Sequence, residues 1–138
     1  MKKSIFAVLL AFSLLFSSGT SVYAYSGGNV ASPYYLYTNS VNSTLIVSGK
    51  TAYCESTITG DSTVTKIYAT QYLEKKNGSK WEVVSKGTWS DSVNGKSLSM
   101  SNSKDNLDSG TYRVRTVGTV YSGSKSEPVE KTSKEVTI

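Results

Sequence analysis

Residues 64–89 read VTKIYATQYLEKKNGSKWEVVSKGTW, and this stretch decides the fold class. Its first run, residues 64–75, alternates apolar and polar side chains, which is the period of a strand with one buried face. Asn77-Gly78 follows and supplies the two positive-φ positions of a tight hairpin turn. The stretch therefore predicts a β-hairpin whose strands are residues 64–75 and 81–89.

Strand-like runs separated by turn residues continue on both sides of this hairpin. We expect further strands at 34–41 and 44–48 (a split first strand), 51–59, 98–103, 111–121 and 127–138. No segment shows sustained helical periodicity, and no internal repeat is present. The pattern predicts an all-β domain of about seven strands, in two antiparallel sheets packed face to face with Greek-key connections.

Alternation in the two longest strands assigns their side chains to a core face and a solvent face. On the core face we expect Ile67, Ala69, Leu73, Tyr112, Val114, Thr116 and Val120. On the solvent face, which carries the charges, we expect Lys66, Tyr68, Thr70, Tyr72, Glu74, Arg113, Arg115 and Thr119. Shared parity in the return strand of the hairpin adds Trp81, Val83 and Trp89 to the core, together with Leu98 and Met100.

The first 24 residues have the three parts of a secretory signal peptide. Lys2 and Lys3 precede an apolar run over 5–16, and Val22-Tyr23-Ala24 offers small groups at the positions that a signal peptidase reads. The apolar run is shorter than the roughly 20 residues that a membrane span needs, and Tyr25 stands where a lipoprotein would have cysteine. We expect cleavage after Ala24, a flexible lead-in over 25–33, a β-sandwich over 34–138 and release without membrane contact. An uncleaved membrane anchor is the alternative.

The charge of the mature chain is mildly positive. Without Lys2 and Lys3, the thirteen remaining Lys and Arg exceed the ten Asp and Glu by three. These cations are scattered along the chain, whereas nucleic-acid-binding proteins concentrate them on one face or arm. We therefore expect no nucleic-acid partner.

The residues needed for most catalytic sites are missing. The chain has no histidine and a single cysteine, which excludes histidine-activated nucleophiles, imidazole-based zinc sites and four-cysteine metal sites. Asp91, Asp105 and Asp108 lie in or beside expected turns, where aspartate is ordinary turn chemistry. A calcium site at 105–108, a glycosidase carboxylate pair and a Ser-Lys dyad remain alternatives. We expect no cofactor and no enzymatic activity.

The run 107–114, LDSGTYRV, resembles the approach to strand F of immunoglobulin and fibronectin type III domains. In those domains a tyrosine two residues before a core position returns its hydroxyl to the backbone. Tyr112 matches that tyrosine, Cys54 matches the first core cysteine, and Val114 stands at the second. The resemblance implies an immunoglobulin-like sandwich without its disulfide, in which Tyr112, Cys54 and Val114 are structural; the usual third-strand tryptophan is absent.

The mature chain is also similar, over 64–81 and 110–127, to a group of small secreted proteins of Gram-positive bacteria. That group has no assigned activity. The similarity implies a fold and a compartment, and it transfers no functional residue.

Lone Cys54 lies at an inward strand position, so we interpret it as a small buried residue. A nucleophile or an intermolecular disulfide would be the functional alternatives. Tyr34, Tyr35 and Tyr37 form a second cluster, which could stack on sugars but is equally typical of a covered first strand.

The most specific surface that the pattern offers is aromatic and cationic. Neighbouring strands would present Tyr68 and Tyr72 beside Arg113 and Arg115, and Tyr and Arg are enriched in protein-binding hot spots. The alternative is that cross-strand pairs simply stabilise a solvated sheet face. We expect a secreted binding module for an extracellular protein or a wall polymer. A self-assembling envelope component and a secreted antagonist are the alternatives, and the sequence leaves the oligomeric state open.

Overall fold

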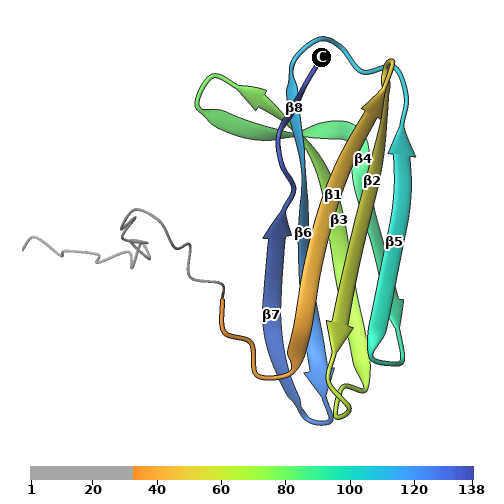
Figure 1. The fold of residues 1–138 in the computed structure, drawn as a ribbon, viewed down its shortest axis with the longest axis vertical. Helices are drawn as coiled ribbons and strands as arrows, with labels where there is room; N and C mark the ends of the chain where they lie inside the picture. The colour runs from red at the N-terminus through yellow and green to blue at the C-terminus, as the bar shows by residue number, and fades with distance from the viewer. Residues whose placement is uncertain (1–32) are drawn as a thin grey trace, which may run out of the picture. The chain divides into compact units, whose positions relative to one another are not determined.

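Eight β-strands and no helix make up residues 33–138, the part of the chain that the computed structural model describes (Figure 1). The strands are β1 (Thr38–Ser48), β2 (Thr51–Gly60), β3 (Lys66–Asn77), β4 (Lys80–Val93), β5 (Ser97–Lys104), β6 (Thr111–Ser122), β7 (Lys125–Thr132) and β8 (Val136–Thr137). No helix in this part is long and apolar enough to cross a membrane. The expected signal peptide, 1–24, and residues 25–32 of the expected lead-in lie outside the described residues.

The strands form two antiparallel sheets, which confirms the predicted all-β class. One sheet has the order β1-β2-β5, and the other has the order β4-β3-β6-β7 with β8 beside β6. The connections β2–β3, β4–β5 and β5–β6 each pass from one sheet to the other. Strands from both sheets contribute to the same buried clusters, so the sheets pack face to face.

The two ends of the domain differ from the predicted strand bounds. The first strand is continuous from Thr38, and residues 33–37 stay outside it because the amides of Leu36 and Tyr37 bind the Glu127 side chain instead of a strand. The last predicted strand is interrupted after Thr132. There the Ser133 hydroxyl replaces a backbone carbonyl as the acceptor for the Val114 amide, at 2.9 Å.

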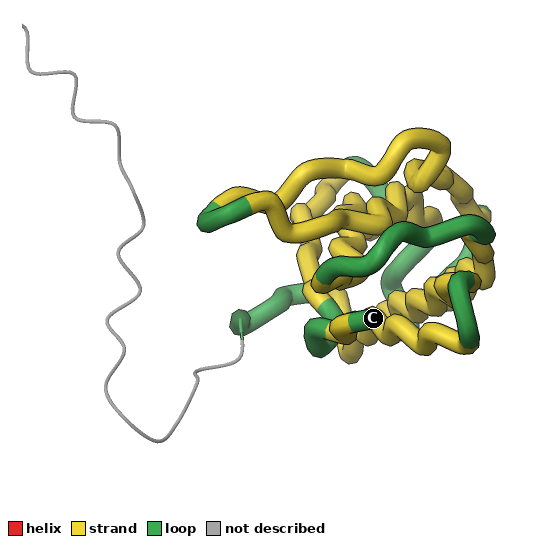
Figure 2. The backbone as a smooth tube through the Cα atoms, turned by 90° about the horizontal axis from the view of Figure 1, so that it is seen from above, coloured by secondary structure: helices red, strands yellow, loops and turns green. Residues whose placement is uncertain are grey.

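The central hairpin forms, but its turn is Gly78-Ser79 and not the predicted Asn77-Gly78, because Asn77 still pairs with Lys80 and only Gly78 of these residues has a positive φ. A bulge also reverses the parity of the return strand. Tyr72 pairs with Thr88 and Glu74 with Val83, so that β4 residues 84–87 all lie opposite Leu73. A bulge bends its strand, and the tip of the hairpin projects from the domain in both views (Figures 1 and 2).

This bulge contradicts two of the predicted core positions. Val83 is 46% exposed, and Trp81 lies against Arg113 on the outer face. Val84 packs inward in their place, and Trp89 packs inward as predicted. The predicted core positions Leu98 and Met100 are confirmed as buried.

The buried interior consists of two apolar clusters with a polar layer between them. The first cluster contains Ile58, Val64, Ile67, Ala69, Leu98, Met100, Val120 and Val129. The second contains Leu45, Ala52, Cys54, Leu73, Leu107, Tyr112 and Val114. Each of five strands places one polar residue at the inward position between the clusters, and we call this set the polar layer: Ser43, Ser56, Gln71, Asn102 and Thr116.

The polar layer is joined by side-chain hydrogen bonds between the sheets. The Gln71 amide nitrogen donates to the Ser56 hydroxyl at 2.7 Å, and Asn102 donates to the Gln71 oxygen at 2.9 Å. The Ser56 and Thr116 hydroxyls lie 2.6 Å apart, and Thr116 donates to Ser43 at 3.1 Å. Every buried side-chain nitrogen and oxygen of the described residues has a partner, so the layer avoids the cost of unsatisfied polar groups.

Candidate binding surface on the five-stranded sheet

Strand register brings three of the four expected binding residues together on the outer face of β3 and β6. Tyr72 lies directly opposite Arg115, and Glu74 lies directly opposite Arg113. Because cross-strand neighbours on one face are only about 4.5–5.5 Å apart between Cβ atoms, these four side chains form one group.

The centre of this group is a buried carboxylate. Glu74 Oε2 accepts a hydrogen bond from Arg113 Nε at 2.7 Å, and Oε1 accepts one from Arg115 Nε at 2.8 Å. Glu74 is only 4% exposed although it lies on the outer face. The prediction that it is solvated is therefore wrong, because the two arginine side chains cover it.

Each arginine also stacks on an aromatic ring. The Arg113 guanidinium lies 4.2 Å from the centroid of the Trp81 ring, and that of Arg115 lies 4.6 Å from the centroid of Tyr72. Lys76 contacts the Trp81 ring too, at 5.6 Å. We call Trp81, Arg113, Glu74, Arg115 and Tyr72 the aromatic–arginine row.

Trp81 is the member of the row that sequence reasoning missed. Its parity with Trp89 assigned it to the core, although Gly87 between them, a glycine inside a strand, is a signal of the bulge that separates the two. The closeness of Trp81 to the turn is a second signal: the turn Gly78-Ser79 places Trp81 directly opposite Lys76, on the outer face.

Each arginine has N–H groups that form no hydrogen bond within residues 33–138. Their hydrogen bonds run through Nε to Glu74, and the structure shows none from the terminal Nη atoms within this range. Burial alone would lower the pKa of Arg115, but the hydrogen bond and the charge of Glu74, with the charge of Glu130, raise it above its usual value. The row therefore presents charged, forked donors on rigid side chains.

Tyr68, the fourth expected binding residue, lies apart from the row. It is on the same face of β3 as Tyr72 but four residues away, roughly 13 Å along a strand. Its side chain is 44% exposed, and its hydroxyl accepts a hydrogen bond from Thr70 at 3.4 Å. Hydrogen bonds from Ser90 and Thr70 lower the pKa of Tyr68.

The three residues expected to be structural lie in or against the second apolar cluster. Cys54 and Val114 are fully buried there, and burial raises the pKa of the Cys54 thiol to about 12. A thiol held protonated is a poor nucleophile. The Tyr112 hydroxyl donates to the carbonyl oxygen of Asp108 at 2.6 Å, four residues upstream.

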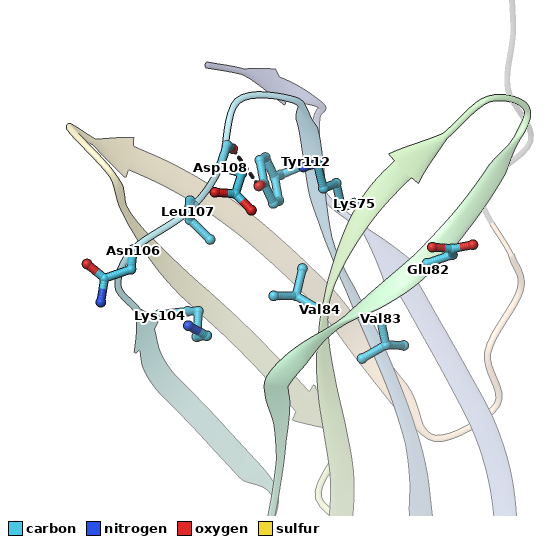
Figure 3. A pocket seen from close by; sticks show the side chains of 9 residues that line it. All are labelled: Lys75, Glu82, Val83, Val84, Lys104, Asn106, Leu107, Asp108 and Tyr112. Atoms are coloured by element: carbon cyan, nitrogen blue, oxygen red, sulfur yellow. Dashed lines mark hydrogen bonds between the residues drawn. The ribbon is translucent and has the colours of Figure 1, made fainter.

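A small pocket lies between the bent hairpin and the loop that precedes β6 (Figure 3). Its volume is about 180 Å³, and Val84, Leu107 and Tyr112 provide its apolar lining while Lys75 and Asp108 lie at its rim. Sites for drug-sized ligands are commonly 300–1,000 Å³. The pocket is thus too small to be the principal binding site, and the outer face of the sheet is the better candidate.

The three tyrosines of the expected cluster do not lie together, and residues 33–138 offer no metal site. Tyr34 is 91% exposed, whereas Tyr35 and Tyr37 pack against the first apolar cluster. The Asp105 carboxylate accepts a hydrogen bond from Thr51 at 2.8 Å. Within residues 33–138 no group of three or more His, Cys, Asp or Glu side chains could hold a metal ion.

Comparisons with protein-family models, with curated proteins and with solved structures find no match for this chain. The outer face of β3 and β6 combines stacked aromatic rings, arginine donors and one buried carboxylate.

Proposed function

We propose that this protein is an exported, non-enzymatic binding module that holds an extracellular partner on the aromatic–arginine row and on Tyr68 of the same outer face. Export is supported by the signal-like residues 1–24. The absence of histidine and the protonated, buried Cys54 support a function without nucleophilic catalysis.

The fold that we propose for the module is immunoglobulin-like. The strand order β1-β2-β5 against β4-β3-β6-β7, with three connections that cross between sheets, supports this assignment. So does the Tyr112–Asp108 hydrogen bond at the start of β6, which has the form of a tyrosine corner.

The observation that carries the proposal is the rigidity of the row. Both arginines are fixed on one side by Glu74 and on the other by an aromatic ring. Arginine and aromatic side chains that are already ordered lose little entropy when a partner binds. The free Nη donors suit a partner that offers carboxylate or carbonyl oxygens, on an extracellular protein or a wall polymer.

The test compares substitutions that remove recognition while keeping the fold. Arg115→Ala is unsuitable because it takes one of two cations from a buried carboxylate, so Arg115→Lys is preferred. A second variant, Tyr68→Ala, removes the exposed ring on the same face. Tyr53→Ala on the other sheet is its matched control, since the two tyrosines are 44% and 46% exposed.

Wild type and variants would be used to capture material from wall fragments and from secreted proteins. We expect Arg115→Lys and Tyr68→Ala each to weaken capture by about 1–3 kcal/mol, a common cost at hot spots. Tyr53→Ala should bind like the wild type. Equal capture by all four proteins would show that the row only stabilises the sheet.

A further inference from the structure

Strand β5 is a regular, uncharged edge of the three-stranded sheet. It pairs with β2 along one side, without any shift in register. Its sequence, SLSMSNSK, has no proline, and its one charge is the terminal Lys104, whose ammonium donates to the Asp105 carbonyl. An edge of this kind is a ready template for another strand.

The other edges of the two sheets carry features that discourage such pairing. Strand β7 has Pro128 and four charged residues, and the Tyr35 hydroxyl bonds to the backbone of Glu130. Strand β4 has the four-residue bulge and Lys86 with a φ of 58°. Strand β1 has a register shift at its start, and β7 and β8 of the other sheet contact it. Proline, charge and bulges are the usual means of protecting an edge.

The side of β5 that faces away from β2 is accessible. A groove of about 560 Å³ runs between β5 and β4, lined by the consecutive residues 99–102 of one strand and 88–91 of the other. Consecutive residues alternate between the two faces of a strand, so it is the backbone edges that line this groove. In Figure 1, β5 forms the rim of the domain.

We propose that β5 pairs antiparallel with β5 of a second copy of this chain, which joins the two three-stranded sheets across a twofold axis. Antiparallel pairing places residues of the same face opposite each other. Outward serines then lie opposite outward serines, and such hydroxyl pairs stabilise a sheet. With the axis at Ser101, this serine faces its own equivalent and the inward residue Met100 faces Asn102, so that no charge lies near the axis.

The pairing of eight-residue strands is a small interface by the standards of stable dimers. We therefore expect association that is weak and depends on concentration. The aromatic–arginine row lies on the other sheet and takes no part in this pairing. The test of dimerisation is therefore independent of the test of the proposed binding function.

The test is sedimentation of the purified protein over a range of concentrations. The wild type should pass from the mass of one chain to that of two. The double variant Ser99→Lys/Ser101→Lys should stay monomeric, because lysines then face lysines across the axis.

The matched control is Thr44→Lys/Thr57→Lys. These positions lie on the same outward face. Thr57 lies opposite Ser99, and Thr44 and Ser101 lie opposite Glu55 from its two sides. The control should therefore associate like the wild type.

Cross-linking provides a readout that does not depend on affinity. On mild oxidation Ser101→Cys should form a disulfide-linked dimer and Thr44→Cys should not, since native Cys54 is buried. Four results would each overturn the proposal: a wild type that stays monomeric, a lysine variant of β5 that dimerises normally, a control that dissociates, or equal cross-linking at both positions.

Discussion

The Arg113 guanidinium lies 4.2 Å from the centroid of the Trp81 ring, although the two residues belong to strands that do not pair with each other. Strand β3 lies between them and contributes Glu74, which receives the Arg113 Nε hydrogen. The bulge in β4 makes this arrangement possible, because it turns Trp81 outward. An ion pair and a cation–π contact thus order one arginine on an outer sheet face.

Glu74→Gln should lower the stability of the protein. The substitution replaces a buried carboxylate that is bound by two guanidinium groups, and hydrogen bonds to charged groups contribute about 1.5–3 kcal/mol. Since both arginines are partly exposed, water compensates for part of the loss, and we expect a decrease of about 1–3 kcal/mol in the free energy of unfolding. Urea denaturation at pH 7 measures it. Glu82→Gln, on an exposed side chain of β4, is the control and should change little.

Tyr112→Phe should remove one hydrogen bond without changing the packing of the ring. The hydroxyl donates to the Asp108 carbonyl at 2.6 Å, and a typical intramolecular hydrogen bond contributes about 1 kcal/mol. The denaturation midpoint should fall while the slope stays the same. Tyr53→Phe, on an exposed ring, should leave the midpoint in place. An unchanged midpoint for Tyr112→Phe would show that the bond contributes nothing to stability.

Alternation and turn residues were sufficient to predict most of the fold. Asn77-Gly78 located the hairpin, and the parity of residues such as Ile67, Leu73, Val114 and Val120 gave their buried positions. These features are local, since each depends on residues a few positions apart. Parity alone could not show the bulge in β4, for which Gly87 inside the strand is a local signal.

The candidate site was predicted in its residues but not in its arrangement. Parity correctly placed Tyr72, Arg113 and Arg115 on one outer face. It also placed Glu74 in water, because alternation reports the direction of a side chain and not what covers it. Whether two arginines fold over a carboxylate depends on register between strands that are about 40 residues apart, and no local pattern contains that information.

Gln71→Leu should be destabilising although it replaces a buried polar residue by an apolar one. Gln71 is fully buried and bonds Ser56 and Asn102 of the other sheet. Leucine would leave the Asn102 amide without its acceptor, and a buried group without a partner costs about 1–3 kcal/mol. The free energy of unfolding should fall by a similar amount. Met100→Leu, a change of similar volume within an apolar cluster, should cost less than about 1.5 kcal/mol. A Gln71→Leu protein as stable as the wild type would show that the polar layer is not required.

Glu127 should make the stability of the domain depend on pH. Its carboxylate accepts hydrogen bonds from the Leu36 amide at 2.7 Å, from the Tyr37 amide at 2.8 Å and from the Thr38 hydroxyl at 2.7 Å. Burial by itself would raise the pKa of Glu127, but these hydrogen bonds, which favour the charged form, hold it below the ordinary value of 4.5. The folded protein therefore binds the proton less tightly than the unfolded chain does.

It follows that the contribution of Glu127 is fully present above about pH 4.5 and is lost as the pH falls through its lowered pKa in the folded protein. Glu127→Gln should be less stable than the wild type at pH 7, by about 1–3 kcal/mol, because an amide accepts these bonds with one oxygen only. The difference between the two proteins should shrink as the pH falls below about 4.5, as the wild-type carboxylate becomes protonated. Urea midpoints measured across this range give the difference directly, with Glu55→Gln on the exposed face of β2 as the control. A gap that stays constant with pH would mean that the carboxylate does not hold the start of β1 through its charge.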